Sequence, residues 1–268
     1  MHLKRWITGL TALPFLIFFV YSGGLLFILL ISFACICSLW EYYRIVFNAD
    51  RQILGGALVW WGYVISFGII LATHFAGTDG AAVLVALNLV FVGLISVFIF
   101  KSNPAVIDVI QKQIQGIVYI PLLISFLVSI RNGPDGMIWI FLLLGIIFTG
   151  DTSAYYVGSY LGRRKLNPAV SPGKTVEGAL GGLAGNLIAG AIGKFFFFPT
   201  LSWGLAILFF VTAGIAGQLG DLFESQLKRS SMIKDSGGIL PGHGGFLDRI
   251  DALLFASPVA YLFIGHIF

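Results

Sequence analysis

The chain has 268 residues, of which 58% are hydrophobic and 10% are charged, and its mean hydropathy is +0.95. This composition excludes an ordinary soluble domain, in which about a quarter of the residues carry a charge. The net charge of +4 does not indicate a nucleic-acid partner, because the basic residues are distributed around apolar runs. We expect an all-α polytopic membrane protein, since a helix satisfies its own backbone hydrogen bonds in lipid.

Apolar runs of about 17–25 residues recur along the chain, and this length matches the roughly 30 Å hydrocarbon core of a bilayer. We predict about nine transmembrane helices. They lie at residues 6–21, 25–40, 54–73, 81–100, 117–130, 137–161, 176–195, 201–220 and 252–268. The first run follows two basic residues, as the core of a signal peptide would. It lacks a small-residue cleavage site, so we interpret it as a span.

Two connecting segments also have a recognisable pattern. Residues 104–115 place apolar side chains at helical spacing with polar ones between them, which is typical of a short interfacial helix. Residues 41–52 are predicted to be a similar cytoplasmic connector. The predicted spans before residue 130 contain little polar chemistry, so we interpret residues 1–130 as a transmembrane scaffold and residues 131–268 as the candidate catalytic transmembrane region.

The distribution of basic residues predicts the topology. With a cytoplasmic N-terminus, the nine spans place fourteen Lys and Arg residues on the cytoplasmic side, and only Arg131 and Lys194 on the other. Cytoplasmic loops carry an excess of basic residues in membrane proteins, so this bias supports the orientation. We therefore expect a multi-pass protein of the cell inner (plasma) membrane, with the charge-rich stretch at residues 225–251 facing the cytoplasm.

Asp151 is an ionisable residue inside a predicted span. It lies 11 residues before Gly162, which is about 16 Å of helix at 1.5 Å per residue. An ionisable group at this depth faces a cavity or a partner, and is a functional candidate by default. The alternative is a structural ion pair or a hydrogen-bonded carboxyl.

Polar and small residues then gather at the start of the seventh span. The Gly173-Lys174-Thr175 sequence resembles the end of a P-loop, but Pro168 occupies the position where that motif needs glycine, so we exclude a P-loop. Lys174 and Glu177 are unusual residues at the start of a span. The spacing of Gly178 and Gly182 permits close helix contact.

The eighth span leads into the charge-rich stretch. Gln218, Asp221, Ser225 and Lys228 lie three or four residues apart and share one helix face. A loop with five glycines between residues 237 and 245 follows, and glycine lets backbone amides approach an anionic ligand. Asp248 and Asp251 begin the last helix, where the helix dipole alone would favour acidic residues. Three carboxylates near basic residues also indicate a Mg²⁺ site for phosphoryl or nucleotidyl chemistry.

The stretch from Ser225 to Asp251 resembles the complete signature of the phosphatidate cytidylyltransferases. The matching parts are Ser225-x-Leu227-Lys228-Arg229, Lys234-Asp235-x-Gly237 and Leu240-Pro241-x-His243-Gly244-Gly245-Phe246-x-Asp248-Arg249-Ile250-Asp251. Asp151-x-x-Ala154-Tyr155 and the segment from Ser171 to Gly178 resemble the second characteristic region of this family. Gly173 departs from it, because lysine is expected there. The first 130 residues resemble the family only in being hydrophobic.

The resemblance implies that CTP and phosphatidic acid react to give CDP-diacylglycerol and pyrophosphate, with Mg²⁺ as cofactor and a second cation left open. It implies catalytic roles for Asp221, Lys234, Asp235, His243, Asp248 and Asp251. Asp221, Asp248 and Asp251 would hold the metal, and His243 would shape the loop around the triphosphate. The substrate-binding residues would be Asp151, Tyr155, Ser171, Lys174, Glu177, Ser225, Lys228, Arg229 and Arg249.

Two alternatives remain open on the sequence. A related membrane cytidylyltransferase that uses an isoprenoid-ether lipid phosphate would carry the same polar signature. A transporter would also place charges in its spans, but its polar groups would not be confined to one half of the chain. The D-G-x-x-A-R motif of the CDP-alcohol phosphotransferases is missing. The many glycines would permit a helix-packed homodimer.

Overall fold

The computed structural model describes residues 13–233, 236–237 and 244–268. These residues contain seven helices that are long and apolar enough to cross a membrane. They are Gly24–Val46, Ala57–Ile99, Val106–Asn132, Gly136–Leu161, Val176–Phe197, Trp203–Ser230 and Leu247–Ile267. The prediction of an all-α polytopic membrane protein is confirmed, with a two-stranded sheet as an addition.

The number of long spans is seven rather than nine, for two reasons. The described part of the first predicted span is a shorter apolar helix, Leu13–Ser22. The third and fourth predicted spans are joined in α4 (Ala57–Ile99), whose 43 residues bend at Gly77. Gly77 has a φ of 68°, a conformation that glycine adopts without steric cost.

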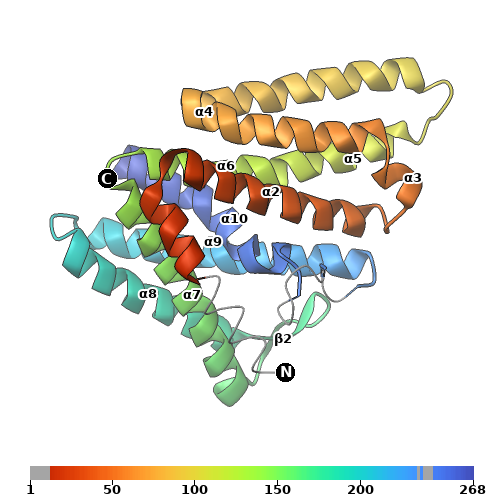
Figure 1. Cartoon of the computed structure of the whole chain (residues 1–268). Helices are drawn as coiled ribbons and strands as arrows, with labels where there is room; N and C mark the ends of the chain where they lie inside the picture. The colour runs from red at the N-terminus through yellow and green to blue at the C-terminus, as the bar shows by residue number, and fades with distance from the viewer. Residues whose placement is uncertain (1–12, 234–235, 238–243) are drawn as a thin grey trace. The chain divides into compact units, whose positions relative to one another are not determined.

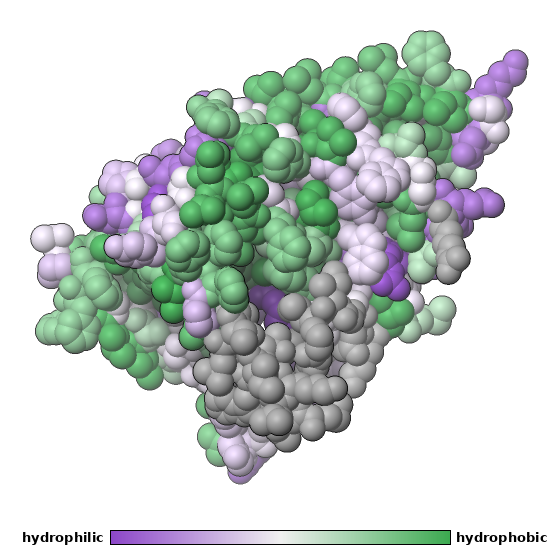
Figure 2. Space-filling model, viewed as in Figure 1, coloured by the Kyte–Doolittle hydropathy of each residue, from purple (hydrophilic) through white to green (hydrophobic). Residues whose placement is uncertain are grey.

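The two halves of α4 lie side by side after this bend (Figure 1). The indole N–H of Trp61 donates a hydrogen bond to Asn88 Oδ1 over 3.0 Å, which joins the halves. The upper part of Figure 2, over α4, is dominated by hydrophobic side chains, as expected of a surface that faces lipid. The polar groups of Trp61 and Asn88 are therefore satisfied within the protein.

The predicted interfacial helix is the start of a longer segment. α5 (Val106–Ile117), the π-helical turn η1 (Val118–Leu122) and α6 (Leu123–Asn132) follow one another without a break. η1 contains Pro121, which lacks the N–H that an α-helical hydrogen bond needs. The amides of Gln113 and Asn88 are buried and form reciprocal hydrogen bonds of 3.2 Å. The prediction of a separate short helix at residues 104–115 is therefore wrong, because the helical segment continues to Asn132 and packs Gln113 against α4.

The predicted connector at residues 41–52 is wrong for its first part. α2 (Gly24–Val46) continues six residues past the predicted end at residue 40, and Glu41 to Val46 are helical. Tyr42 and Tyr43 are fully buried, so this turn packs in the interior. A short helix, α3 (Arg51–Leu54), then leads to α4.

The helices divide into two compact units, which we describe separately. The first contains the described parts of Met1–Asn132 and Ser231–Arg249, and the second contains Gly133–Ser230 and Ile250–Phe268. The segment Ser231–Arg249, which holds most of the signature, thus belongs to the same unit as α2, α4, α5 and α6. The functional division at residue 130 stays a prediction.

The second unit is built on close helix contacts at glycine. α7 (Gly136–Leu161) packs along α8 (Val176–Phe197), and α9 (Trp203–Ser230) packs against α8. A Cβ on Gly178 would lie 2.9 Å from the carbonyl oxygen of Ala154, and one on Gly182 would lie 3.1 Å from Ala154 Cβ. The predicted close contact at Gly178 and Gly182 is therefore confirmed.

A small hairpin joins α7 to α8. β1 (Lys165–Asn167) pairs antiparallel with β2 (Ser171–Thr175), so that Lys165 lies opposite Thr175. Thr175 then caps α8, because its side chain accepts a hydrogen bond from the Gly178 N–H over 3.1 Å. Lys174 lies in this strand, immediately before the helix.

Candidate active site

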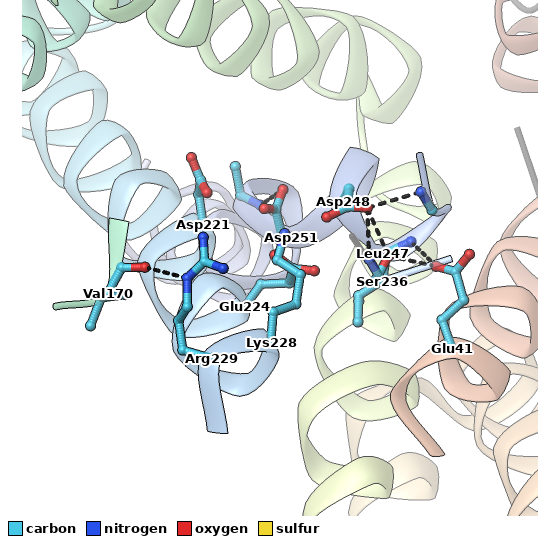
Figure 3. A network of polar contacts seen from close by, with 12 residues as sticks. Glu41, Val170, Asp221, Glu224, Lys228, Arg229, Ser236, Leu247, Asp248 and Asp251 are labelled. Atoms are coloured by element: carbon cyan, nitrogen blue, oxygen red, sulfur yellow. Dashed lines mark hydrogen bonds and ion pairs between the residues drawn. The ribbon is translucent and has the colours of Figure 1, made fainter. Parts of the chain in front are cut away.

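The second unit brings carboxylates from two helices together. Asp221 and Glu224 belong to α9, and Asp251 belongs to α10 (Leu247–Leu262). Glu224 is fully buried and Asp251 is 8% exposed. Asp221, Glu224 and Asp151 are all close enough for their charges to act on Asp251. Figure 3 shows the side chains of Asp221, Glu224 and Asp251 gathered between the two helices.

A glycine in α9 allows this approach. A Cβ on Gly220 would overlap the carbonyl oxygen of Asp251, and it would lie 3.1 Å from Phe255 Cβ. A Cβ on Gly217, one turn earlier, would be in ordinary contact with Ala252 at 3.6 Å. The backbone of α10 therefore rests directly on α9 next to Asp221.

Lysines neutralise two of these carboxylates. Lys174 Nζ lies 2.7 Å from Asp221 Oδ2, and Lys228 Nζ lies 2.5 Å from Glu224 Oε2. The first pair joins the hairpin to α9, and the second joins successive turns of α9. The second pair is largely withdrawn from solvent, with side-chain exposures of 12% and 0%, whereas the first pair is partly exposed, with 27% and 37%. Buried charges persist only when they are paired, so Lys228 stabilises the buried carboxylate of Glu224.

Asp251 has contacts of a different kind. Its Oδ1 accepts a hydrogen bond from the Ala252 N–H over 2.8 Å, while acidic residues act on it from α7 and α9. An acidic side chain surrounded by others is suited to binding a cation or the cationic groups of a ligand.

Two of the predicted substrate residues have structural contacts. Glu177 accepts hydrogen bonds from the backbone N–H groups of Arg163 and Arg164, with a shortest distance of 3.0 Å. It therefore fixes the end of α7 against the start of α8. Arg229 Nε donates to the carbonyl oxygen of Val170 over 3.3 Å, which holds the hairpin turn to the end of α9.

The remaining described candidates differ in exposure. Asp151 and Tyr155 are exposed on α7, and Asp151 lies ten residues from the helix end at Leu161. Ser171 and Ser225 are half-buried, and Arg249 is exposed. Lys234, Asp235 and His243 lie outside the described residues.

Asp248 belongs to a second polar network, in the first unit. Its Oδ2 accepts hydrogen bonds from the Gly245 N–H over 2.9 Å, from Ser236 Oγ over 2.8 Å and from the Ser236 N–H over 3.3 Å. Asp248 thus ties Ser236 to the start of α10. On that helix it lies three residues before Asp251, so the two carboxylates share one face.

Glu41 of α2 is the other acidic residue of this network, and the sequence did not reveal it. Its carboxylate accepts hydrogen bonds from the N–H groups of Phe246 and Leu247 and from Ser236 Oγ. Figure 3 shows it pointing toward Ser236 and Leu247. The only sequence signal was an acidic residue next to a span, which is easily interpreted as the beginning of a loop.

The described residues can be tested for a fit to Mg²⁺. They contain no group of three or more His, Cys, Asp and Glu side chains placed to hold a metal ion. Magnesium is commonly held by one or two carboxylates, with water and substrate phosphates completing its shell. Asp221 and Asp251 supply such oxygens from adjoining helices, so the donor set fits this mode. The assignment of Asp221, Asp248 and Asp251 as metal ligands stays a prediction.

Comparisons with known proteins agree over the whole chain. A family model described as the cytidylyltransferase family matches residues 3–267. The phosphatidate cytidylyltransferase of Bacillus subtilis is 33% identical over 265 residues, which cover 98% of this chain and 97% of the relative. That of Brucella abortus is 32% identical over 98% of this chain and 93% of the relative. That of Staphylococcus haemolyticus is 43% identical over about half of each chain, 51% and 52%.

The chain therefore belongs to the cytidylyltransferase family. It is accordingly a nucleotidyltransferase with transmembrane helices.

Proposed function

We propose that this protein is a phosphatidate cytidylyltransferase of phospholipid biosynthesis. It transfers CMP from CTP to phosphatidic acid, giving CDP-diacylglycerol and pyrophosphate. The observation that carries the proposal is the cluster of two lysine–carboxylate pairs at the C-terminal half of α9, in a chain that matches phosphatidate cytidylyltransferases along nearly its full length. Such a cluster suits a reaction between a lipid phosphate and a nucleoside triphosphate, because both reactants are polyanions.

The reaction needs electrostatic positioning more than proton transfer. The phosphate of the lipid is already anionic at neutral pH, so its oxygen attacks the α-phosphorus of CTP without a general base. A bond forms between that oxygen and the α-phosphorus, the bond between the α-phosphorus and its bridging oxygen to the β-phosphorus breaks, and pyrophosphate leaves. The protein must hold the two anions in line and stabilise the charge on the leaving group.

The residues of the second unit supply these functions. Lys174 and Lys228, which are paired with carboxylates, exchange part of that pairing for phosphate oxygens when substrates bind. Asp221 and Asp251, with Asp248 on the same helix face as Asp251, would hold Mg²⁺. When bound, this ion neutralises charge on the phosphates and on the departing pyrophosphate. Asp151 and Tyr155, exposed on α7, lie toward the headgroup of the lipid.

The location follows from the substrates. CTP is a cytoplasmic metabolite, and the bias of basic residues supports a cytoplasmic orientation of the stretch at residues 225–251. We therefore place the protein in the cell inner (plasma) membrane, with its active site open to the cytoplasm.

The test is an assay of the protein purified in detergent. We expect pyrophosphate release that requires both CTP and phosphatidic acid, with CDP-diacylglycerol identified by mass spectrometry. A chelator should stop the reaction and excess Mg²⁺ should restore it. An isoprenoid-ether lipid phosphate serves as the competing acceptor. The proposal fails if that lipid reacts and phosphatidic acid does not, or if no pyrophosphate is released from either lipid.

A further inference from the structure

Glu41 is a fully buried acidic residue in a helix that the sequence assigns to the scaffold. Its relative exposure is 0%. Its Oε1 accepts a hydrogen bond from the Phe246 N–H over 2.9 Å, and its Oε2 accepts one from the Leu247 N–H over 2.8 Å. Ser236 Oγ lies 3.1 Å from Oε2 and 2.8 Å from Asp248 Oδ2, so its single hydroxyl hydrogen is shared between the two carboxylates. Burial of a carboxylate is unfavourable unless such donors compensate it, so this contact is specific.

The backbone donors to Glu41 lie at the start of α10. Phe246 and Leu247 are the residues at which α10 begins, and their N–H groups have no acceptor within the helix. Glu41 therefore supplies, from another helix, the anion that satisfies the helix start. Ser236 lies ten residues earlier, so the same carboxylate joins the two ends of the segment from Ser236 to Phe246.

The glycines of the segment fit this role. A Cβ on Gly237 would overlap Glu41 Oε1, and a Cβ on Gly245 would lie 2.6 Å from Glu41 Oε2 and overlap Ser236 Oγ. Neither glycine has a positive φ, so backbone conformation does not require glycine at these positions. Glycine is required because a Cβ would not fit beside Glu41. The sequence suggested that these glycines make room for an anionic ligand. At Gly237 and Gly245, the anionic group for which glycine makes room is the carboxylate of Glu41.

α2 makes two further contacts with residues between α9 and α10. Ser231 Oγ donates to the carbonyl oxygen of Ile45 over 2.8 Å. The ring of Phe33 packs edge-on against Phe246 at a centroid distance of 5.8 Å. α2 thus contacts the beginning and the end of the segment between α9 and α10.

We propose that Glu41 is a positioning residue for nucleotidyl transfer. It fixes the start of α10 and joins Ser236 to Phe246 and Leu247, and so sets the direction of Asp248. Asp248 shares Ser236 Oγ with Glu41, which couples the two carboxylates through one hydroxyl. This inference rests on the proposed function, because it concerns the geometry of that reaction.

The test uses an isosteric change. In Glu41→Gln an NH₂ group replaces one carboxylate oxygen, so at least one of the backbone donors at Phe246 and Leu247 loses its acceptor. Ser38→Ala is the matched control, because Ser38 is also fully buried on α2, one turn earlier, and its Oγ has no hydrogen-bond partner among the described residues. Both variants are compared with the wild type in detergent, at a temperature well below their melting points.

Two readouts separate positioning from stability. We expect kcat of Glu41→Gln to fall about 10-fold or more while KM for CTP changes less than about threefold. Hydrogen exchange of a peptide containing Phe246 and Leu247 should become about 10-fold faster, as the loss of a buried hydrogen bond implies. Ser38→Ala should change neither. A role in stability alone would lower the melting temperature and leave kcat of the folded enzyme unchanged, and that result would overturn the proposal.

A second variant covers the case in which Glu41→Gln does not fold. Ser236→Ala removes the shared hydroxyl and leaves no buried backbone donor without its partner at Phe246 or Leu247. We expect a fall in kcat of about threefold or more, and an unchanged kcat would contradict the inference. Failure of the proposed function and failure of the role of Glu41 give different results. An inactive wild type refutes the proposed function, whereas an active wild type matched by Glu41→Gln, or unchanged exchange at Phe246 and Leu247, refutes only the role of Glu41.

Discussion

Lys174 Nζ and Asp221 Oδ2 lie 2.7 Å apart and join the hairpin between α7 and α8 to the C-terminal half of α9. The pair links the two regions of sequence that resemble the family, one around Ser171–Thr175 and the other beginning near Asp221. A lysine next to a candidate metal ligand can neutralise the carboxylate before substrates bind and contact a phosphate afterwards. This double use makes Lys174 the most informative basic residue to change.

Replacement of Lys174 by methionine should lower kcat/KM about 100-fold, because it removes a preorganised positive charge from the site. Steady-state assays of pyrophosphate release would measure the effect. Lys165→Met is the matched control, since Lys165 is an exposed lysine of β1 in the same hairpin. Equal kcat/KM values for the two variants would contradict a role of Lys174 in substrate binding.

Asp251→Asn should weaken metal binding. We expect the Mg²⁺ concentration for half-maximal activity to rise about 10-fold or more, because one of few oxygen donors loses its charge. Titration of the protein with Mn²⁺ as a paramagnetic substitute, followed by electron paramagnetic resonance, measures binding without turnover. An unchanged Mn²⁺ affinity would show that Asp251 is not a ligand.

Asp248 can act as a metal ligand or through the loop that it holds, and two variants distinguish these roles. We expect Asp248→Asn to abolish turnover in a folded protein, whereas Ser236→Ala, which removes a hydrogen bond to Asp248 Oδ2, should retain measurable activity. Assays over a Mg²⁺ titration provide the comparison. Activity of Asp248→Asn within tenfold of the wild type would show that the ligand assignment is wrong.

Gly220→Ala should separate α10 from α9 next to Asp221, because the new Cβ would overlap the Asp251 carbonyl oxygen. Overpacking of this kind costs about 1–3 kcal/mol, and it should lower both the melting temperature and kcat. Gly204→Ala in the same helix is the control, since no atom lies within 4 Å of a Cβ there. That change should be neutral or stabilise by up to about 1 kcal/mol. Equal melting temperatures for the two variants would contradict this packing.

Much of the fold could be predicted because few backbone structures satisfy all their hydrogen bonds in lipid. Apolar runs of the right length become helices, and the glycines at positions 178 and 182 indicated the contact of α8 with α7 before its geometry was known. The break near Gly77 was also visible as a gap between two apolar runs. The hairpin at Lys165–Thr175 could not be predicted, because its strands of three and five residues are too short and polar to show a pattern.

The site was predictable only where its residues are close in sequence. The spacing of Gln218, Asp221, Ser225 and Lys228 predicted one shared helix face, and all four lie in α9. The pairing of Lys228 with Glu224 was not predicted. Glu41 escaped prediction because its partners lie 195 to 206 residues away. A single sequence carries no periodic signal over such a distance. From the sequence, the glycine-rich stretch next to these partners is also interpreted as a loop that binds an anionic ligand. An acceptor from within the protein was therefore not expected for its backbone N–H groups.

The long separation between Glu41 and its donors has a consequence for biogenesis. α2 is synthesised early, and the carboxylate of Glu41 has no hydrogen-bond donors from Ser236 or α10 until those residues have been synthesised. At about 5–20 residues per second, the ribosome needs on the order of 10–40 s to add the intervening chain. During that interval Glu41 has to be hydrated or protonated, because a bare carboxylate is not tolerated in hydrocarbon. The hydrogen bonds of Glu41 are therefore completed only after Ser236 and the start of α10 have been synthesised.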